Sequence, residues 1–330
     1  MTLVAAWIRR TVGVEELVVA SDSRLTGGIA LNHAPKLFPL ERADSLLAYC
    51  GPTVVAYPIL LQVKASLDAN ERTRKRLVDI VDLKVHIEKS IEGLRAQIKD
   101  LPSGDATNRA FKFLLAGYSW KHGCFRAWIF RYDTQTREFN AHSMPRLGRG
   151  FVFMSDVDEN ERRARERLNR LVFERRDSPL PYLDWEPLRV LLSFIQDPNC
   201  DDSGGPPQII KVYRHANVLP INVLWHERAS LDGIPYRRYE VAHLGRPLLD
   251  GEPTALLTLN LEDWQFVEPW NIRSLAKQYN DRELRTALHT KLVRLLDRQR
   301  RGRERGEVIH SMLKRGAPFR DIQAYLSSVD

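Results

Sequence analysis

The sequence has few cysteines and no long apolar run. Its three cysteines, Cys50, Cys124 and Cys200, are widely spaced and form no Cys-x-x-Cys pair, so neither a disulfide framework nor a zinc site is indicated. No stretch approaches the roughly 18 to 20 uninterrupted apolar residues that span a bilayer, and the first residues lack a signal-peptide pattern. We therefore expect a cytoplasmic protein with no membrane partner.

Several catalytic and cofactor-binding motifs are also missing. The histidines show no His-x-x-x-His or similar metal-ligand spacing. No Gly-x-Ser-x-Gly elbow occurs, which disfavours an α/β-hydrolase. The Gly204-Gly205 pair lacks the following Lys-Ser or Lys-Thr of a phosphate-binding loop. The sequence therefore predicts no metal and no cofactor.

The composition is otherwise that of a globular protein, and its excess charge is local. Of 330 residues, 43% are hydrophobic and 28% are charged, which excludes collagen-like and disordered classes. The formal net charge is +8, and residues 271–330 contribute 14 Lys or Arg against 7 Asp or Glu. The first 270 residues are thus nearly neutral, and the basicity belongs to the C-terminal part.

Apolar periodicity predicts two runs of strands, each followed by a pair of helices. The predicted strands cover residues 2–9, 15–21, 36–40, 45–50, 111–118, 125–132, 138–143, 208–213 and 218–225. The predicted helices cover residues 53–70, 77–101, 162–175 and 185–196. This order predicts an α+β fold with antiparallel sheets inside and helices outside, since a doubly wound sheet would alternate single strands with single helices.

The pattern changes after Trp225, which predicts a C-terminal extension. Its expected elements are strands at 239–244 and 255–260 and helices at 272–301 and 308–326, the last broken at 316–318. We therefore expect one domain over residues 1–226 and a largely helical extension over residues 227–330.

The opening residues place a threonine where it can become a nucleophile. Removal of Met1 before a small residue would leave Thr2 as the mature N-terminus. Its free α-amine, with an ordinary pKa of about 7.7 to 8.0, can accept the proton of its own hydroxyl without a histidine. Such a site needs a nearby cation and a carboxylate that holds the cation. Lys36 and Asp22 are the candidates for these two roles.

Three short motifs resemble the proteasome β subunits and the bacterial HslV-type peptidases. They are Val18-Val19-Ala20-Ser21-Asp22-Ser23-Arg24-Leu25-Thr26, Lys36-Leu37-Phe38 and Ala48-Tyr49-Cys50-Gly51, with a predicted helix after the last. The Met-Thr start also looks like that of the bacterial Anbu branch.

The resemblance implies a role for each matched residue. Thr2 would be the nucleophile, Asp22 and Lys36 would orient and polarise it, and the Gly51 amide would complete an oxyanion hole. The implied fold is that of an N-terminal-nucleophile (Ntn) hydrolase, an αββα four-layer sandwich of two antiparallel sheets.

Two serines complete the set that the resemblance implies. Asp202-Ser203-Gly204-Gly205 looks like the family's Ser-Gly-Gly segment, where the serine supports the terminal amine. Ser155 falls near a second family serine that precedes a helix. The family has an aspartate three residues before the first serine, but this chain has Cys200, so Asp197, Asp201 or Asp202 would have to substitute.

The activity that the resemblance implies is hydrolysis of peptide bonds by a threonine peptidase. Its substrate would be a peptide or protein, and its relatives imply a homo-oligomer that forms a ring or an open helical array. Two alternatives stay open. One is a catalytically inactive relative with a structural role, and the other is a nucleic-acid-associated factor.

The second alternative depends on an arginine-rich segment near the C-terminus. Arg298-Gln299-Arg300-Arg301-Gly302-Arg303-Glu304-Arg305 has five arginines in eight residues. Such a run is typical of a solvated helix end, and it can also bind phosphates or an acidic protein partner. An apolar stripe that includes Leu284, Leu288, Leu292 and Leu295 precedes it and is expected to pack on the parent domain or on a neighbouring subunit.

Overall fold

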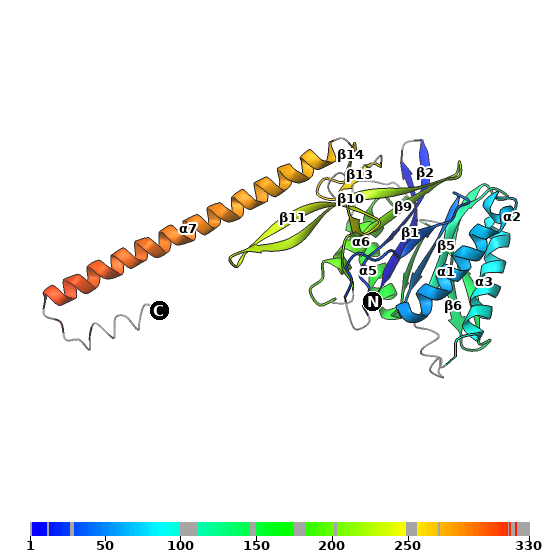
Figure 1. Cartoon of the computed structure of the whole chain (residues 1–330), viewed down its shortest axis with the longest axis horizontal. Coiled ribbons are helices and arrows are strands. Elements are labelled where there is room, and N and C mark those ends of the chain that lie inside the picture. The colour runs from blue at the N-terminus through cyan, green and yellow to red at the C-terminus, as the bar shows by residue number, and fades with distance from the viewer. Residues whose placement is uncertain are drawn as a thin grey trace. The chain divides into compact units, whose positions relative to one another are not determined.

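The protein is an α+β structure with two β-sheets and helices packed on them (Figure 1). The computed structural model describes residues 2–11, 13–26, 30–99, 111–145, 150–174, 182–200, 203–248, 256–269, 271–315, 317 and 321. The α+β class predicted from the order of strands and helices is thereby confirmed. Among the described helices, none is both long and apolar enough to cross a membrane.

The larger sheet contains the two N-terminal strands near one of its edges. Its strands are β1 (Leu3–Thr11), β2 (Val14–Ser21), β8 (Phe151–Ser155), β9 (Gln208–Tyr213), β10 (Asn217–Leu231), β11 (Ile234–His243), β12 (Arg246–Pro247), β13 (Thr258–Asn260) and β14 (Gln265–Val267). The main order is β12-β11-β10-β9-β2-β1-β8, with β13 and β14 attached beside β10. β1 pairs antiparallel with both β2 and β8, so the start of β1 lies between the end of β2 and the end of β8.

The smaller sheet has the order β3-β4-β5-β6-β7 and is antiparallel throughout. Its strands are β3 (Leu37–Pro39), β4 (Ser45–Cys50), β5 (Lys112–Ser119), β6 (Cys124–Asp133) and β7 (Glu138–Ser143). The helices are α1 (Thr53–Ala69), α2 (Glu71–Arg74), α3 (Ile80–Ala96), α5 (Asp158–Glu174), α6 (Glu186–Ile195) and α7 (Ile272–Lys314).

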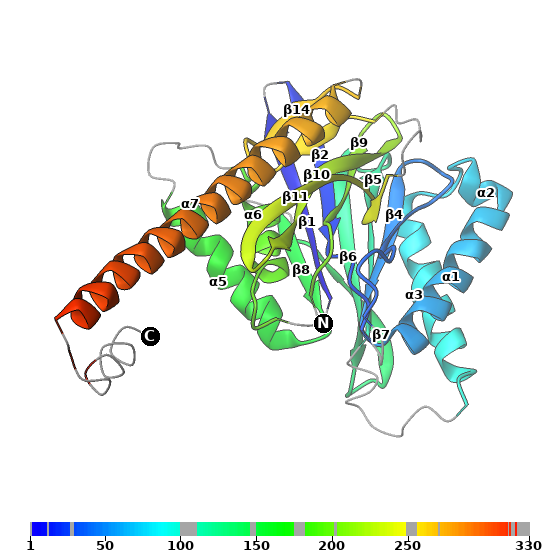
Figure 2. The ribbon, with the colours of Figure 1, turned by 60° about the vertical axis from the view of Figure 1, so that its left-hand side comes forward.

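Three apolar cores hold the layers together. One lies between the two sheets and joins β1 and β2 to β4 and β5. A second lies between the larger sheet and helices α5 and α6, and a third between the smaller sheet and helices α1 and α3. Figure 2 shows these two helix pairs on opposite outer sides of the sheets.

The sequence of β1 explains why both of its faces are buried. Leu3, Ala5 and Trp7 belong to the core beneath α5 and α6, whereas Val4 and Ala6 belong to the core between the sheets. Because side chains alternate along a strand, a strand whose first residues include no polar position has to be covered on both faces.

The chain forms two compact units. The first contains residues 1–225 and 240–272, and the second contains residues 226–239 and 273–330. A single division after residue 226 therefore differs from the structure at residues 240–272. Those residues pair with the first unit, since Asn222 of β10 is in register with Thr258 of β13.

The second unit consists of the far part of the β10–β11 hairpin together with α7. The side-chain amide of Asn280 accepts a hydrogen bond from the Tyr239 backbone N–H at 2.6 Å and donates one to the Tyr239 carbonyl at 2.9 Å. Tyr279 stacks on Tyr239 with ring centroids 4.7 Å apart. The helix runs without interruption to Lys314, whereas the sequence predicted a break near residue 301. The strong helix formers on both sides outweigh the cost of two interior glycines.

Candidate active site

Thr2, Asp22 and Lys36 lie together in a buried site. The Lys36 ammonium nitrogen is 2.8 Å from the Thr2 hydroxyl oxygen and 2.9 and 3.0 Å from the two Asp22 carboxylate oxygens. Lys36 and Asp22 are fully buried, and Thr2 is 5% exposed. The structure therefore brings a cation, its carboxylate partner and a threonine hydroxyl into one hydrogen-bonded group.

The register of the larger sheet places these residues. Val4 of β1 is opposite Ser21 of β2, so Asp22 comes directly beside the first residues of β1. The Leu3 backbone N–H donates to the Asp22 carboxylate at 3.3 Å, and the Arg24 N–H donates to it at 3.2 Å. Lys36 immediately precedes β3 of the other sheet and reaches the same point from there.

The electrostatics of the pair follow from its burial. Burial raises the pKa of the Asp22 carboxyl above its ordinary value, and the Lys36 ammonium and the backbone donors Leu3 and Gly204 oppose that rise. With the ammonium donating to both carboxylate oxygens, the pair is held as an ion pair away from solvent. A positive charge is therefore fixed against the Thr2 oxygen.

Gln208, at the start of β9, links the segment that carries Lys36 to the segment that carries Asp22 through hydrogen bonds. Its amide oxygen accepts from the backbone N–H groups of Lys36 and Leu37 at 3.0 and 3.3 Å. Its amide nitrogen donates to the carbonyls of Ala34 and Asp22 at 2.7 and 3.3 Å. Sequence reasoning missed Gln208, because a glutamine that opens a strand carries no local sign of such contacts.

Asp156 is a second residue that sequence reasoning did not place in the site. Its carboxylate accepts a hydrogen bond from the Thr2 backbone nitrogen at 3.0 Å and another from the Ser155 hydroxyl at 3.1 Å. Leu3 of β1 is opposite Ser155 of β8, which accounts for the contact. Ser155 was among the candidates, and it meets Thr2 through Asp156.

A buried ionic cluster fixes the end of β8 where Ser155 lies. The Glu161 carboxylate accepts from the Ser155 backbone N–H at 3.0 Å and from the Lys112 ammonium at 2.8 Å. It also pairs with Arg131. Because Glu161 is 2% exposed, this ion-paired carboxylate holds the Ser155–Asp156 turn firmly.

Gly51 follows the last residue of β4 and leads into α1. Its φ is 109°, which favours glycine. The Asp156 charge acts on the thiol of the preceding residue, Cys50, so the end of β4 lies near Asp156. Burial raises the pKa of the Cys50 thiol well above its ordinary value, which keeps this cysteine a thiol rather than a nucleophilic thiolate.

Ser203 is 1% exposed, and within the described residues its hydroxyl has no hydrogen-bond partner. The adjoining glycines hold its segment against Asp22. The Gly204 carbonyl accepts from the Ser23 N–H at 3.1 Å, and its N–H reaches the Asp22 carboxylate. Gly205 has φ +70°, and an added Cβ would come within 2.0 Å of the Asn32 carbonyl oxygen, so only glycine fits there.

The sequence suggested Asp197, Asp201 or Asp202 as the substitute for the family's aspartate. None of these three is the aspartate found in contact with Thr2. The Asp197 carboxylate accepts from the Asn199 N–H at 3.0 Å and pairs with Arg167 at 3.5 Å. Asp201 and Asp202 lie outside the described residues. Asp156, from the β8 end of the sheet, is the carboxylate found at the Thr2 nitrogen.

No protein-family model matches the sequence, and no curated protein matches it either. Within the described residues, no group of three or more His, Cys, Asp or Glu side chains is arranged to hold a metal ion. A hydroxyl beside a fixed ammonium, with a carboxylate at the nitrogen of the same residue, is an arrangement suited to nucleophilic attack.

Proposed function

We propose that this protein is a threonine-type amidohydrolase with an Ntn-hydrolase fold, and that it cleaves peptide bonds through Thr2 after removal of Met1. The observation that carries the proposal is the 2.8 Å hydrogen bond from Lys36 to the Thr2 hydroxyl, with Lys36 held by Asp22. The sequence resemblance to proteasome β subunits and HslV-type peptidases supports the same assignment. The two facing sheets with outer helices are compatible with the αββα arrangement of that class.

The first half of the proposed reaction is acylation of Thr2. The hydroxyl oxygen attacks the carbonyl carbon of the substrate, and the free α-amine of Thr2 accepts the hydroxyl proton. Lys36 stabilises the negative charge that develops on the attacking oxygen. The Gly51 N–H binds the oxyanion, a role worth about 3 to 4 kcal/mol for such a donor in other enzymes. The C–N bond breaks, and the leaving amine takes the proton from the α-ammonium.

The second half is hydrolysis of the ester. Water attacks the acyl carbon and transfers its proton to the α-amine, and the Thr2 oxygen leaves and recovers a proton. Each step returns the amine to its starting state, so the cycle needs no cofactor. In this proposal Asp156, which accepts from the Thr2 backbone nitrogen, orients the amine, and Glu161 holds the turn that carries Asp156.

The decisive experiment is intact-mass spectrometry before and after treatment with a peptide vinyl sulfone. The expected result is a chain that lacks Met1 and gains one probe mass, with Thr2→Ala losing all labelling. Thr2→Ala keeps a small residue after Met1, so processing stays comparable. Thr11→Ala, which changes an exposed threonine at the far end of β1, is the matched control and should label normally.

Two results would contradict the proposal. Retention of Met1 in active preparations would block the α-amine and would favour an inactive structural role. Equal labelling of the wild type and Thr2→Ala would show that another residue is the nucleophile.

A further inference from the structure

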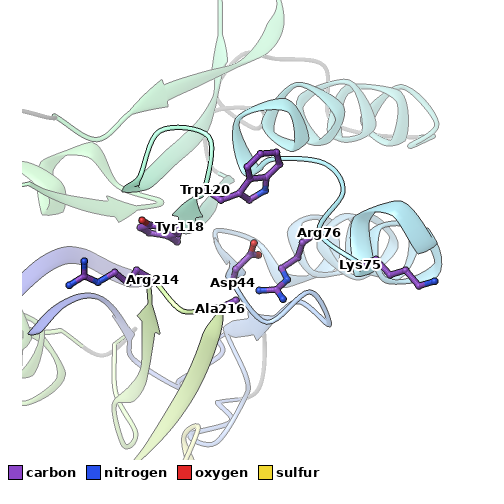
Figure 3. Close-up of a pocket in the computed structure, with 7 residues that line it drawn as sticks. All are labelled: Asp44, Lys75, Arg76, Tyr118, Trp120, Arg214 and Ala216. Atoms are coloured by element: carbon purple, nitrogen blue, oxygen red, sulfur yellow. The ribbon is translucent and has the colours of Figure 1, made fainter.

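A pocket in the first unit is lined by side chains that the proposed reaction does not use. Figure 3 shows this site, the Trp120 pocket, which has a volume of about 290 Å³ and is lined by Asp44, Lys75, Arg76, Tyr118, Trp120, Arg214 and Ala216. The lining comes from the segments before β4, after α2, around the end of β5 and between β9 and β10. It is distinct from the Thr2 site.

The two sites lie at opposite ends of β4. Asp44 precedes the first residue of this strand, and Gly51 follows its last residue. A strand of this length spans about 20 Å, since each residue rises roughly 3.3 Å. A ligand of the pocket would therefore not touch the proposed catalytic residues.

The pocket is bordered by positive charge that is not neutralised among the described residues. Arg76 and Arg214 are exposed, and within the described residues neither guanidinium takes part in an ion pair. Lys75 is already paired with Glu71 and extends away from the other side chains in Figure 3. Figure 3 shows the Arg76 side chain reaching toward Asp44, whereas the Arg214 guanidinium extends away on the opposite side of the pocket. An exposed guanidinium without an ion-pair partner at the rim of a pocket favours an anion, and phosphate most of all because of its matching geometry.

The one carboxylate of the pocket does not cancel this charge. Asp44 is 3% exposed, and its two oxygens accept from the Arg42 guanidinium at 2.6 and 3.0 Å. The Ser45 hydroxyl donates to it at 3.0 Å. Since Arg42 neutralises Asp44 from within the protein, the unpaired charges that border the pocket, among the described residues, are those of Arg76 and Arg214.

An exposed aromatic side chain completes the site. Trp120 is 51% exposed although it is the largest apolar side chain type, and it lies in the turn between β5 and β6. Tyr118 beside it is held by an edge contact with Phe125, with ring centroids 5.3 Å apart. An open indole face next to cationic groups offers a stacking surface for a flat ring.

The backbone of the pocket is held in an uncommon conformation. Arg76 and Ala216 both have φ of 57°, in the left-handed region that non-glycine residues seldom adopt. The Arg76 N–H donates to the Thr73 carbonyl at 3.0 Å, which fixes the turn that carries this arginine. Such conformations persist where the surrounding structure imposes them, and they are frequent at binding sites.

We propose that the Trp120 pocket binds an organic phosphate that carries a flat ring, of the size of a nucleoside monophosphate. The ring would stack on Trp120, and the phosphate would bind the Arg76 guanidinium, with the exposed Arg214 side chain turning toward it from the opposite rim. A volume near 290 Å³ is at the lower end of the range for small-molecule sites, which begins at about 300 Å³, and suits a ligand of this size. The proposal does not depend on the activity at Thr2.

Calorimetric titration of the full chain tests both halves of the ligand. The probes are adenosine 5′-monophosphate, adenosine, inorganic phosphate and a short single-stranded oligoadenylate. The monophosphate should bind more tightly than adenosine or phosphate alone. Tighter binding of the oligoadenylate than of the monophosphate would identify single-stranded nucleic acid as the source of the ligand, and the reverse would identify a free nucleotide.

Variants then assign the binding to the pocket. Trp120→Ala and the double variant Arg76→Asn with Arg214→Gln should each weaken monophosphate binding by about tenfold or more. Asparagine is chosen at position 76 because it tolerates the left-handed backbone. Phe173→Ala, an exposed aromatic on α5, and Arg74→Asn, an exposed arginine on α2, are the matched controls and should bind as the wild type does.

The proposal fails if no probe binds at millimolar concentration. It also fails if the controls lose as much affinity as the pocket variants, because binding would then be a general property of the surface. Thermal melts of every variant show that a loss of binding is not a loss of fold. Since labelling of Thr2 is a separate measurement, failure of this site and failure of the peptidase proposal are distinguishable.

Discussion

The buried charges around Thr2 depend on one another. Lys36 and Asp22 are both removed from solvent, and each is the other's ion-pair partner. Loss of one partner from such a pair commonly costs about 3 to 5 kcal/mol, because an unpaired charge stays buried. Substitutions at either residue therefore mix an effect on folding with an effect on chemistry, and Asp156 offers a cleaner test.

In the proposed peptidase, with Met1 removed, Asp156→Asn should move the acidic limb of the pH profile for peptide cleavage to lower pH. A carboxylate near the Thr2 ammonium stabilises its charged form and so raises the pH at which the amine becomes a base. Asparagine removes that charge and keeps the size of the side chain. We expect the limb, measured as kcat/KM against pH, to shift by about one unit.

The matched control for this change is Glu159→Gln, an exposed carboxylate at the start of α5 that pairs with Arg162. It should leave the limb in place. An equal shift in the two variants would mean that general surface charge, rather than the contact with Thr2, sets the profile. An unchanged limb in Asp156→Asn would remove Asp156 from the proposed machinery.

Helix α3 is anchored at its first residues by a buried side chain. Asp79 precedes α3 and is fully buried. Its carboxylate accepts from the Val81 N–H at 2.9 Å, from the Ser119 hydroxyl at 2.9 and 3.1 Å and from the Lys121 N–H at 3.1 Å. One side chain therefore caps the helix and ties it to the β5–β6 turn.

Asp79→Ala should lower the free energy of unfolding by about 2 to 4 kcal/mol. The substitution removes an N-cap and leaves buried donors without a partner. Chemical denaturation followed by circular dichroism measures the loss. Asp82→Ala, one turn further along the same helix, breaks only an exposed pair with Lys121 and should cost about 0.5 kcal/mol or less. Similar losses in both variants would contradict the capping role.

The charge of the whole molecule is divided unequally between its two units. Arg298, Arg300, Arg301 and Arg303 are exposed on α7. Among their side chains, Arg300 makes an exposed pair with Glu304 at 2.9 Å, so these residues contribute little to stability. A concentrated row of such charges controls attraction to polyanions.

Replacement of these four arginines by glutamine should lower the salt concentration at which the protein elutes from heparin. The free energy of unfolding should change by no more than about 0.5 kcal/mol. The control removes the same charge from exposed positions of the first unit, with glutamine at Arg72, Arg74, Lys89 and Arg170. Equal shifts in elution would show that net charge, and not the α7 cluster, determines the attraction.

Much of the layered fold can be predicted from local pattern. The strands from β1 to β4 and the helices α1, α3, α5 and α6 fall where apolar periodicity places them. Periodicity indicates which face of a segment is buried, and it depends only on residues that are close together in the sequence. The continuous helix α7 is harder to predict from the sequence, because it depends on helix propensity summed over a long segment. The assignment of residues 240–272 to the first unit is also hard to predict, because it depends on a strand partner distant in the sequence.

What the sequence by itself determined was the identity of the three central residues of the proposed site. A threonine after Met1, an aspartate after β2 and a lysine before β3 are recognisable because each lies directly next to a strand signal. Only the tertiary structure decided that Asp156 meets the Thr2 nitrogen, that Gln208 joins Lys36 to Asp22, and that Arg76, Trp120 and Arg214 share a pocket. These contacts join residues far apart in the chain, so they follow from strand register and sheet packing, which no local pattern contains.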